Sequence, residues 1–182
     1  GGVPVAAEVA RALGAELDVL VARKVGAPRQ PELALGAVTA SGELYLDTAL
    51  VENLRVSREE LDAIIARERD EATRRETRFR SERPFPEVAG RTVIVVDDGL
   101  ATGATMRAAL HALRQLEPGR LVVAVPVGAR RTCEALAGLA DRSVCLQAPE
   151  NFHAVGQFYE DFRPTTDEEV DAILARFREP SA

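Results

Sequence analysis

Residues 92–105 read TVIVVDDGLATGAT, and this stretch decides the fold. Its apolar residues, from Val93 to Val96, are typical of a strand that is buried on both faces of a parallel sheet. Two aspartates and a loop rich in Gly and Thr follow, and an amphipathic segment begins near Met106. We therefore predict a parallel strand that leads through a loop into a helix, which is the building unit of open α/β sheets.

The loop after this strand combines small residues with hydroxyls. In open α/β sheets, ligands bind at the carboxyl ends of strands, where loop N–H groups and the next helix N-terminus attract anions. Gly99 and Gly103 allow positive φ and a close approach of phosphate, and Thr102 and Thr105 can donate hydrogen bonds. The loop contains no Lys or Arg, so backbone dipoles would hold the anion. This favours a phosphate monoester over a triphosphate.

Asp97 and Asp98 stand between the strand and the loop. Ionised carboxylates only accept hydrogen bonds, so they are natural partners for two vicinal hydroxyls, directly or beside a hydrated Mg²⁺. A diol partner next to a phosphate cradle predicts a ribose 5-phosphate site. The alternative is a plain Gly-Thr turn, although two buried acids would then have no packing role. A Walker loop is disfavoured because Ala104 stands where its Lys is required.

Residues 93–105 closely resemble the signature of the type I phosphoribosyltransferases. The resemblance implies an open, mainly parallel twisted sheet with flanking helices, in a single domain over residues 1–182. It implies that Asp97 and Asp98 hold the ribose hydroxyls and contact Mg²⁺ only indirectly, through those hydroxyls or water. The residues that the resemblance assigns to phosphoribosyl pyrophosphate in this loop are Gly99, Ala101, Thr102, Gly103, Ala104 and Thr105.

The chain starts with Gly1 and Gly2, and the next residues to Leu13 predict a buried helix that Gly14 ends. Two glycines before a helix are an anion-binding arrangement. In the family, a strand and a small-residue loop at this point bind the pyrophosphate. The resemblance therefore implies that Gly1 and Gly2 end that loop and that the preceding strand is missing. The alternative is a cloning remnant.

Residues 16–22 predict a strand that ends at Arg23 and Lys24, followed by a loop over residues 25–32 that contains Pro and Gly. All other basic residues of the chain are Arg, so Lys24 suggests a need for a compact ammonium. We expect the basic pair at the same sheet edge as the phosphate loop. The resemblance implies that Arg23 and Lys24 contact the pyrophosphate or the transition state. A solvated strand end is the alternative.

Two further segments are expected around the sheet. Residues 33–83 predict an inserted hairpin and a long helix that starts at a capping box on Ser57. Its apolar stripe is thin and needs cover from the sheet or a second subunit, which makes a homodimer plausible. Residues 148–182 predict a hood with clustered aromatics. Within it, the resemblance makes Phe152 the candidate that stacks on the acceptor base, with plain packing as the alternative.

Composition limits the classes of function. The net charge of −6 provides no basic surface, which argues against nucleic-acid binding. No apolar run reaches the ~18 residues that span a bilayer, and no signal peptide is visible, so we expect a cytoplasmic protein without membrane contact. Cys133 and Cys145 lack metal-ligand spacing and are expected to be buried free thiols without a pairing framework.

The resemblance implies transfer of the 5-phosphoribosyl group from phosphoribosyl pyrophosphate to a nitrogenous base, with release of pyrophosphate and with Mg²⁺ as cofactor. Lys24, Asp97 and Asp98 are the expected catalytic residues. The alternatives are a regulator that binds phosphoribosyl pyrophosphate or a ribose phosphate without catalysis, and a structural partner subunit. Residues 23–28, 154–156 and 159–162 together also resemble a bacterial group of phosphoribosyltransferases with unassigned substrate, so no particular base is predicted.

Overall fold

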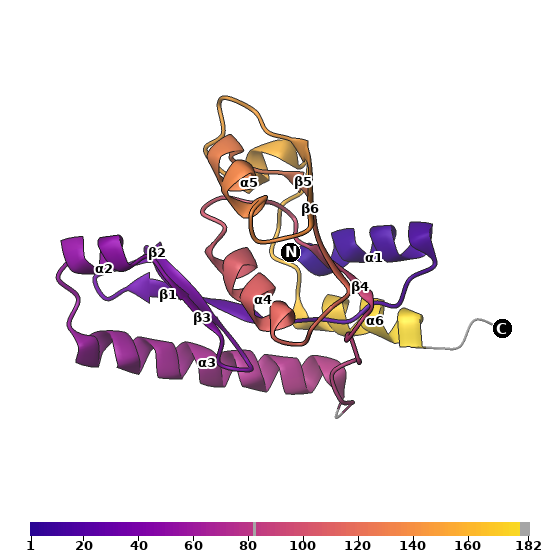
Figure 1. The fold of residues 1–182 in the computed structure, drawn as a ribbon, viewed down its shortest axis with the longest axis horizontal. Coiled ribbons are helices and arrows are strands. Elements are labelled where there is room, and N and C mark those ends of the chain that lie inside the picture. The colour runs from indigo at the N-terminus through magenta and orange to yellow at the C-terminus, as the bar shows by residue number, and fades with distance from the viewer. Residues whose placement is uncertain (82, 179–182) are drawn as a thin grey trace.

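A computed structural model describes residues 1–81 and 83–178 of the chain. Its strands form two three-stranded sheets, one antiparallel and one parallel, which lie side by side in Figure 1. The elements are α1 (Gly2–Leu13), β1 (Ala22–Ala27), β2 (Gln30–Thr39), β3 (Leu44–Leu46), α2 (Thr48–Asn53), α3 (Arg58–Arg80), β4 (Thr92–Val96), α4 (Ala104–Arg114), β5 (Arg120–Val127), α5 (Arg130–Leu136), β6 (Arg142–Gln147), the 3₁₀ helix η1 (Val155–Phe158) and α6 (Asp167–Arg178).

The parallel sheet has the strand order β4-β5-β6. Val93 of β4 pairs with Leu121 of β5, and Val123 pairs with Ser143 of β6. The buried side chains of β5 form a core with Leu110 of α4 and Leu136 of α5. An open parallel sheet with flanking helices is the fold class that the sequence predicted. The predicted strand, loop and helix at residues 92–105 are confirmed by β4, the loop and α4.

The segment before β1 corrects one prediction. Residues 15–21 have no regular secondary structure, so the strand expected over residues 16–22 is wrong. This segment and the free edge of β4 line an apolar cavity of about 480 Å³, together with α1, α6 and residues around Phe85. The edge of β4 opposite β5 therefore faces a cavity rather than another strand of the described chain.

The loop predicted over residues 25–32 is also wrong, because β1 continues to Ala27 and turns through Pro28 into β2. The register shifts on both sides of Gly26, as in a β-bulge. A Cβ on Gly26 would overlap the carbonyl oxygen of Pro31. Gly26 therefore serves a close approach of two strands, whereas glycine and proline in the sequence had suggested a loop. The hairpin around residues 39–42 is confirmed by β2 and β3.

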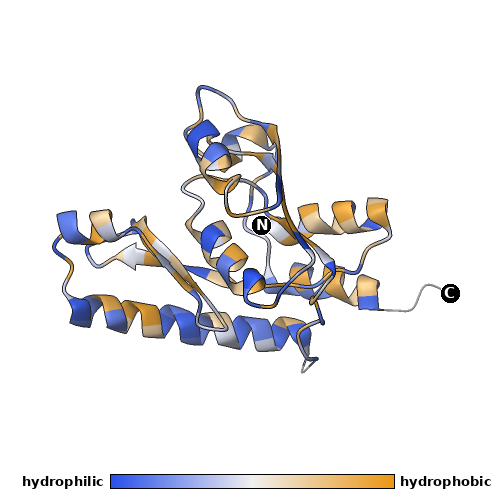
Figure 2. Cartoon of the chain, in the orientation of Figure 1, coloured by the Kyte–Doolittle hydropathy of each residue, from blue (hydrophilic) through white to orange (hydrophobic). Residues whose placement is uncertain are grey.

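The long helix α3 begins at the Ser57 capping box, as predicted, and ends at Arg80. It runs along the antiparallel sheet, and its apolar residues alternate with polar ones in Figure 2. Leu61, Ile64 and Ile65 pack against the buried cluster of β1 and β2. The chain itself thus covers the predicted stripe, and the stripe gives no reason for a second subunit.

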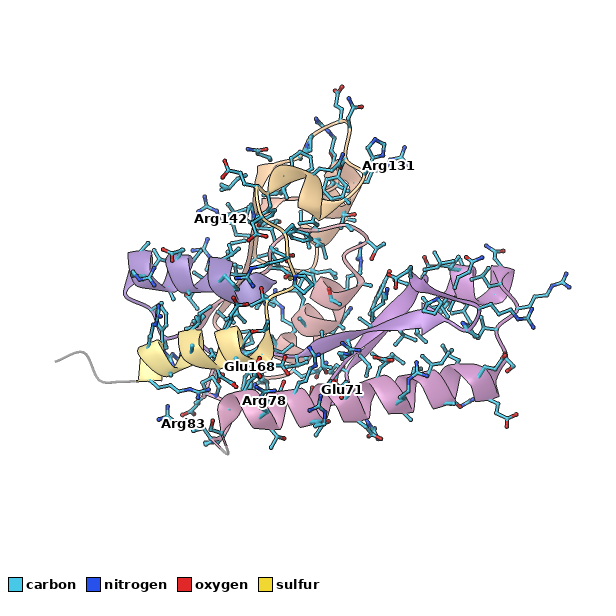
Figure 3. The ribbon with its side chains drawn as sticks, turned by 180° about the vertical axis from the view of Figure 1, so that it is seen from behind. Glu71, Arg78, Arg83, Arg131, Arg142 and Glu168 are labelled. Carbon is cyan, nitrogen blue, oxygen red and sulfur yellow. The ribbon has the colours of Figure 1, made fainter. Side chains whose placement is uncertain are left out.

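At its carboxyl end α3 is tied to α6 by charge. The Arg78 guanidinium lies 2.9 Å from Asp167, 2.9 Å from Glu168 and 3.1 Å from Asp171. Figure 3 shows Arg78 and Glu168 between the two helices. The acidic first turn of α6 also favours its helix dipole. These contacts join the inserted helix to the tail.

Two of the predicted segments contain positions outside the described residues. These are position 82 in the insertion over residues 33–83 and positions 179–182 in the hood over residues 148–182. Within the described ranges, no helix combines the length and the apolar character that crossing a membrane requires.

Candidate functional site

The loop between β4 and α4 is fixed to the carboxyl end of β5. The Leu100 N–H donates to the Val127 carbonyl at 3.0 Å, and the Leu100 carbonyl accepts from the Ala129 N–H at 2.8 Å. The Thr132 hydroxyl of α5 donates to the Ala101 carbonyl at 2.7 Å. Leu100 is buried, whereas Ala101 and Thr102 are exposed. The loop is therefore fixed to β5 and α5 by hydrogen bonds, while Ala101 and Thr102 face solvent. No sequence signal had pointed to Thr132.

The two loop glycines have different roles. Gly103 has φ 73° and caps α4 without a side-chain hydrogen bond. The Ala104 N–H donates to the Thr102 hydroxyl at 3.4 Å, so the amides that follow it in the first turn of α4 remain for an anion. Gly99 is not among the residues with positive φ, so the structure does not use the freedom that a glycine gives at this position. A Cβ on Gly99 would lie 2.6 Å from Cγ1 of Val155. The absence of a side chain at position 99 lets Val155 of η1 approach the loop.

The start of α1 lies directly against the two aspartates. A Cβ on Gly1 would overlap the Asp98 carboxylate, and a Cβ on Gly2 would lie 2.8 Å from Oδ1 of Asp97. The amino group of Gly1 is 4.0 Å from Oδ2 of Asp98. The N-termini of α1 and α4 thus flank the aspartates and the loop, and their dipoles favour a bound anion.

Asp97 has an unusual ionisation. Burial, followed by the charge of Asp98, raises the pKa of Asp97 to about 6, although the Asp98 N–H donates to its Oδ1 at 2.9 Å. Desolvating a carboxylate beside another carboxylate destabilises the folded chain. This cost indicates that the pair has a role other than packing.

A pH dependence of stability follows. The folded pKa of Asp97 is about 6 and the reference value is 3.8, so the folded state binds more protons between these values. The free energy of unfolding should therefore fall as pH rises from about 4 to about 7, by roughly 2 kcal/mol from this group. Urea unfolding at several pH values measures the fall. The Asp97→Asn variant should lack this component, and an unchanged slope in that variant would contradict the assignment.

The tail covers the aspartates with an aromatic residue that sequence reasoning missed. The Tyr159 hydroxyl donates to the Asp98 carbonyl at 2.7 Å. Burial and the carboxylates of Asp98 and Asp97 raise the pKa of Tyr159. Tyr159 lay within the clustered aromatics, but nothing in their order distinguished it. It fixes the tail against the end of β4.

Phe152, the predicted base-stacking residue, does not line the cavity in this region. Phe152 stacks on Phe158, with ring centroids 5.8 Å apart and planes at 13°. Phe158 and Tyr159, together with Pro126 of β5 and Pro4 of α1, line a cavity of about 450 Å³. Phe152 supports Phe158, and Phe158 is the ring that lines the cavity.

The basic pair is not at the edge where the sequence placed it. Lys24 and Arg23 lie within β1 of the antiparallel sheet, not at the carboxyl end of a parallel strand. Arg23 pairs with Glu68 at 3.0 Å, and Nζ of Lys24 lies 2.9 Å from Glu32. The prediction failed because β1 continues past both residues to Ala27 before it turns into β2.

Lys24 nevertheless faces the side of the sheet that contacts α4. Its strand partner is Ala37, which packs in one cluster with Ala104 and Ala108 at the start of α4. Directly paired residues in adjacent strands point to the same face. The Lys24 side chain therefore lies on the side of the sheet that α4 covers, and its ammonium is paired with Glu32.

The chain is similar to several known proteins. A model of the phosphoribosyl transferase domain family matches residues 1–163. The chain belongs to this family. Two Mycobacterium tuberculosis proteins, from strains CDC 1551 / Oshkosh and H37Rv, are each named "Putative phosphoribosyl transferase" and are 46% identical to the chain over 176 residues. The match covers 97% of the chain and 40% of each relative, so the chain spans about two fifths of their length.

A solved structure, TT1426 from Thermus thermophilus, also resembles this phosphoribosyl transferase domain. The two are 48% identical and superpose with a TM-score of 0.77, covering 96% of the chain and 83% of TT1426. The resemblance first carried by residues 93–105 is thus confirmed at the level of the family.

Proposed function

We propose that this phosphoribosyl transferase domain binds phosphoribosyl pyrophosphate between α1 and α4 and transfers its phosphoribosyl group to a nitrogenous base. The observation that supports the proposal most is the convergence of two helix N-termini on a loop next to Asp97 and Asp98. Helix N-termini attract anions, and adjacent carboxylates accept hydrogen bonds from a diol. Phosphoribosyl pyrophosphate carries both kinds of group.

Each part of the site has a proposed role. The amides and hydroxyls from Ala101 to Thr105 bind the 5-phosphate, because Gly103 provides no side-chain cap for α4 and Ala101 and Thr102 are exposed. Asp97 and Asp98 orient the ribose hydroxyls. Gly1 and Gly2 bring the positive end of α1 directly against the two aspartates, where its dipole would favour the negative charge of the pyrophosphate.

The residues present fit a Mg²⁺ that arrives on the substrate. In the part of the chain that the structure describes, no group of three or more His, Cys, Asp or Glu residues could hold a metal by itself. Mg²⁺ commonly uses one or two carboxylates together with substrate phosphates and water. Asp97 and Asp98 would provide this contact through hydroxyls or water, and the metal would neutralise charge on the departing pyrophosphate.

The protein contributes mainly position and charge. Transfer passes through a transition state with positive charge on the sugar, and the aspartates, held near it by Tyr159 and the Asp98 N–H, favour this charge. Asp97 is half-buried, so solvent screens its charge less than that of an exposed carboxylate. The cavity lined by Phe158 and Tyr159 is the proposed place for the base, with Phe152 as support.

We also propose a further strand along the free edge of β4. The cavity between β4 and residues 15–20 is lined mostly by apolar residues, and β4 forms no strand pair on that side within the described chain. An extended segment there would pair with β4 and continue towards Gly1. Hydrogen exchange tests this: β4 amides that point away from β5 should exchange quickly in the 182-residue chain and slowly when a preceding segment is supplied. Equal exchange would contradict it.

The proposed function is tested by binding and turnover in parallel. Calorimetry with phosphoribosyl pyrophosphate should show saturable binding, and a panel of bases should include one that triggers pyrophosphate release. Binding without release for every base would instead support the regulator that the sequence left as an alternative. Absence of binding would contradict both.

Lys24 gives a separate prediction. We expect Lys24 to leave Glu32 and reach the pyrophosphate, so Lys24→Ala should lower kcat about tenfold or more. Lys24→Arg should stay well below the parent, because a planar guanidinium replaces a compact ammonium. Initial rates of pyrophosphate release measure both. Glu32→Gln is the control and should retain activity, since it frees the ammonium. A fully active Lys24→Arg variant would refute the role.

A further inference from the structure

Cys133 and Cys145 lie in contact behind the phosphate loop. Cys133 is on α5 and Cys145 is on β6, and their Sγ atoms are 2.8 Å apart. Both are free, as expected, and they are partly rather than fully buried. Packing of α5 on β6 brings them together, and their spacing in the sequence gives no sign of it.

We propose that Cys133 and Cys145 are a redox-active thiol pair that closes an intramolecular disulfide by exchange with a low-molecular-weight disulfide. The proposal stands independently of the proposed function. The S–S bond length is about 2.05 Å, so the two sulfurs need to approach by less than about 1 Å. Such a movement is within the reach of side-chain rotation at two partly buried positions.

The hydrogen bonds indicate the order of events. The Cys133 S–H donates to Sγ of Cys145, and the Cys145 S–H donates to the Gln147 carbonyl at 3.2 Å. Burial, followed by the contact with Cys145, raises the pKa of Cys133 to about 12, which makes it the poorer first nucleophile. Cys145 is therefore the attacking residue.

The thiol–disulfide exchange takes two steps. The Cys145 thiolate attacks one sulfur of the small disulfide, breaks its S–S bond and releases one thiolate. Cys133 then loses its proton to solvent and attacks the Cys145 sulfur, which expels the second thiolate. Two protein thiols are oxidised to one disulfide, and the small disulfide is reduced to two thiols, which take up the two protons.

The pair is connected to the candidate site through short contacts. Thr132, next to Cys133, donates to the Ala101 carbonyl of the loop. A Cβ on Gly128 would lie 2.6 Å from Sγ of Cys133, and the Gly128 N–H donates to the same Gln147 carbonyl at 3.0 Å. A disulfide would therefore fix the start of α5 to β6 directly below the loop.

The test is incubation of the reduced 182-residue chain with oxidised glutathione, followed by intact mass and peptide mapping. We expect a loss of two hydrogen atoms and a peptide pair linked through Cys133 and Cys145. The linked form should exceed the glutathione adduct by about tenfold or more, because the second thiol is held at a high effective concentration. The Tm should rise on oxidation and return on reduction.

Two serine variants serve as matched controls. Cys133→Ser should accumulate the glutathione adduct at Cys145, and Cys145→Ser should leave Cys133 largely unmodified. If either variant does not fold, the peptide map of the parent decides alone. Unlinked thiols, separate glutathione adducts on both cysteines, or a bond between two molecules would each overturn the proposal.

Discussion

Replacing Asp97 and Asp98 together by Asn is expected to lower kcat/KM for pyrophosphate release by on the order of a hundredfold or more. The two carboxylates lie at the end of β4 between two helix N-termini, where they would orient the sugar and favour its positive charge. Asn keeps the size of the side chain and removes the charge. The loss should therefore appear mainly in kcat, which steady-state kinetics with saturating phosphoribosyl pyrophosphate measures.

The Asp97→Asn substitution on its own tests whether the carboxylate serves activity or stability. Since burial and Asp98 raise the pKa of Asp97, Asp97→Asn should be at least as stable as the parent at pH 7.5. A variant that is stable but inactive would indicate that the carboxylate serves the reaction and not the stability of the fold. Asp70→Asn, at an exposed position on α3, is the matched control and should leave both activity and stability unchanged. Normal turnover in the double variant would remove the central role of the pair.

Gly2→Ala is expected to weaken the binding of phosphoribosyl pyrophosphate about tenfold or more. The new methyl group would lie 2.9 Å from Cα of Asp97 and 2.9 Å from the Val96 carbonyl oxygen. These are backbone atoms, so no rotation of a side chain relieves the overlap, and α1 must move away from the loop. A displacement of this kind separates the two helix N-termini that flank the proposed anion site. Calorimetry gives the change in Kd.

The expected net loss in the free energy of unfolding of Gly2→Ala is at most about 2.5 kcal/mol. Overpacking costs about 1–3 kcal/mol, while Ala gains roughly 0.5–1 kcal/mol over Gly within a helix. Gly138→Ala is the matched control, because a Cβ there meets no atom within 4 Å and the residue has no positive φ. Parent-like affinity in Gly2→Ala would show that the start of α1 does not contribute to the ligand site.

The sequence predicted the site best where its signals were local. The apolar run at β4, the aspartates and the Gly-Thr loop are adjacent in the chain, and each indicates one step of the strand-loop-helix unit. The Ser57 capping box predicted the start of α3 for the same reason. Features that depend on neighbouring residues alone can be recognised without knowledge of the tertiary structure.

The remaining features depend on residues far apart in the chain. Gly26 suggested a loop because its close approach to Pro31 in a bulged hairpin has no local pattern. Tyr159 reaches the Asp98 carbonyl and Thr132 reaches the Ala101 carbonyl only after the sheet has formed. The contact between Cys133 and Cys145 arises in the same way. Tertiary packing decides such contacts, and hydrophobic periodicity carries no information about them.

The central claim is that a ribose phosphate binds with its phosphate at the amides from Ala101 to Thr105 and its hydroxyls at the two aspartates. The most direct measurement is an NMR titration of the ¹⁵N-labelled chain with ribose 5-phosphate. The account predicts that the largest and saturable shifts fall on the amides of residues 99–105 and of Gly2, and that Asp97→Asn with Asp98→Asn weakens them. Shifts confined to other surfaces, or none at these amides, would contradict it.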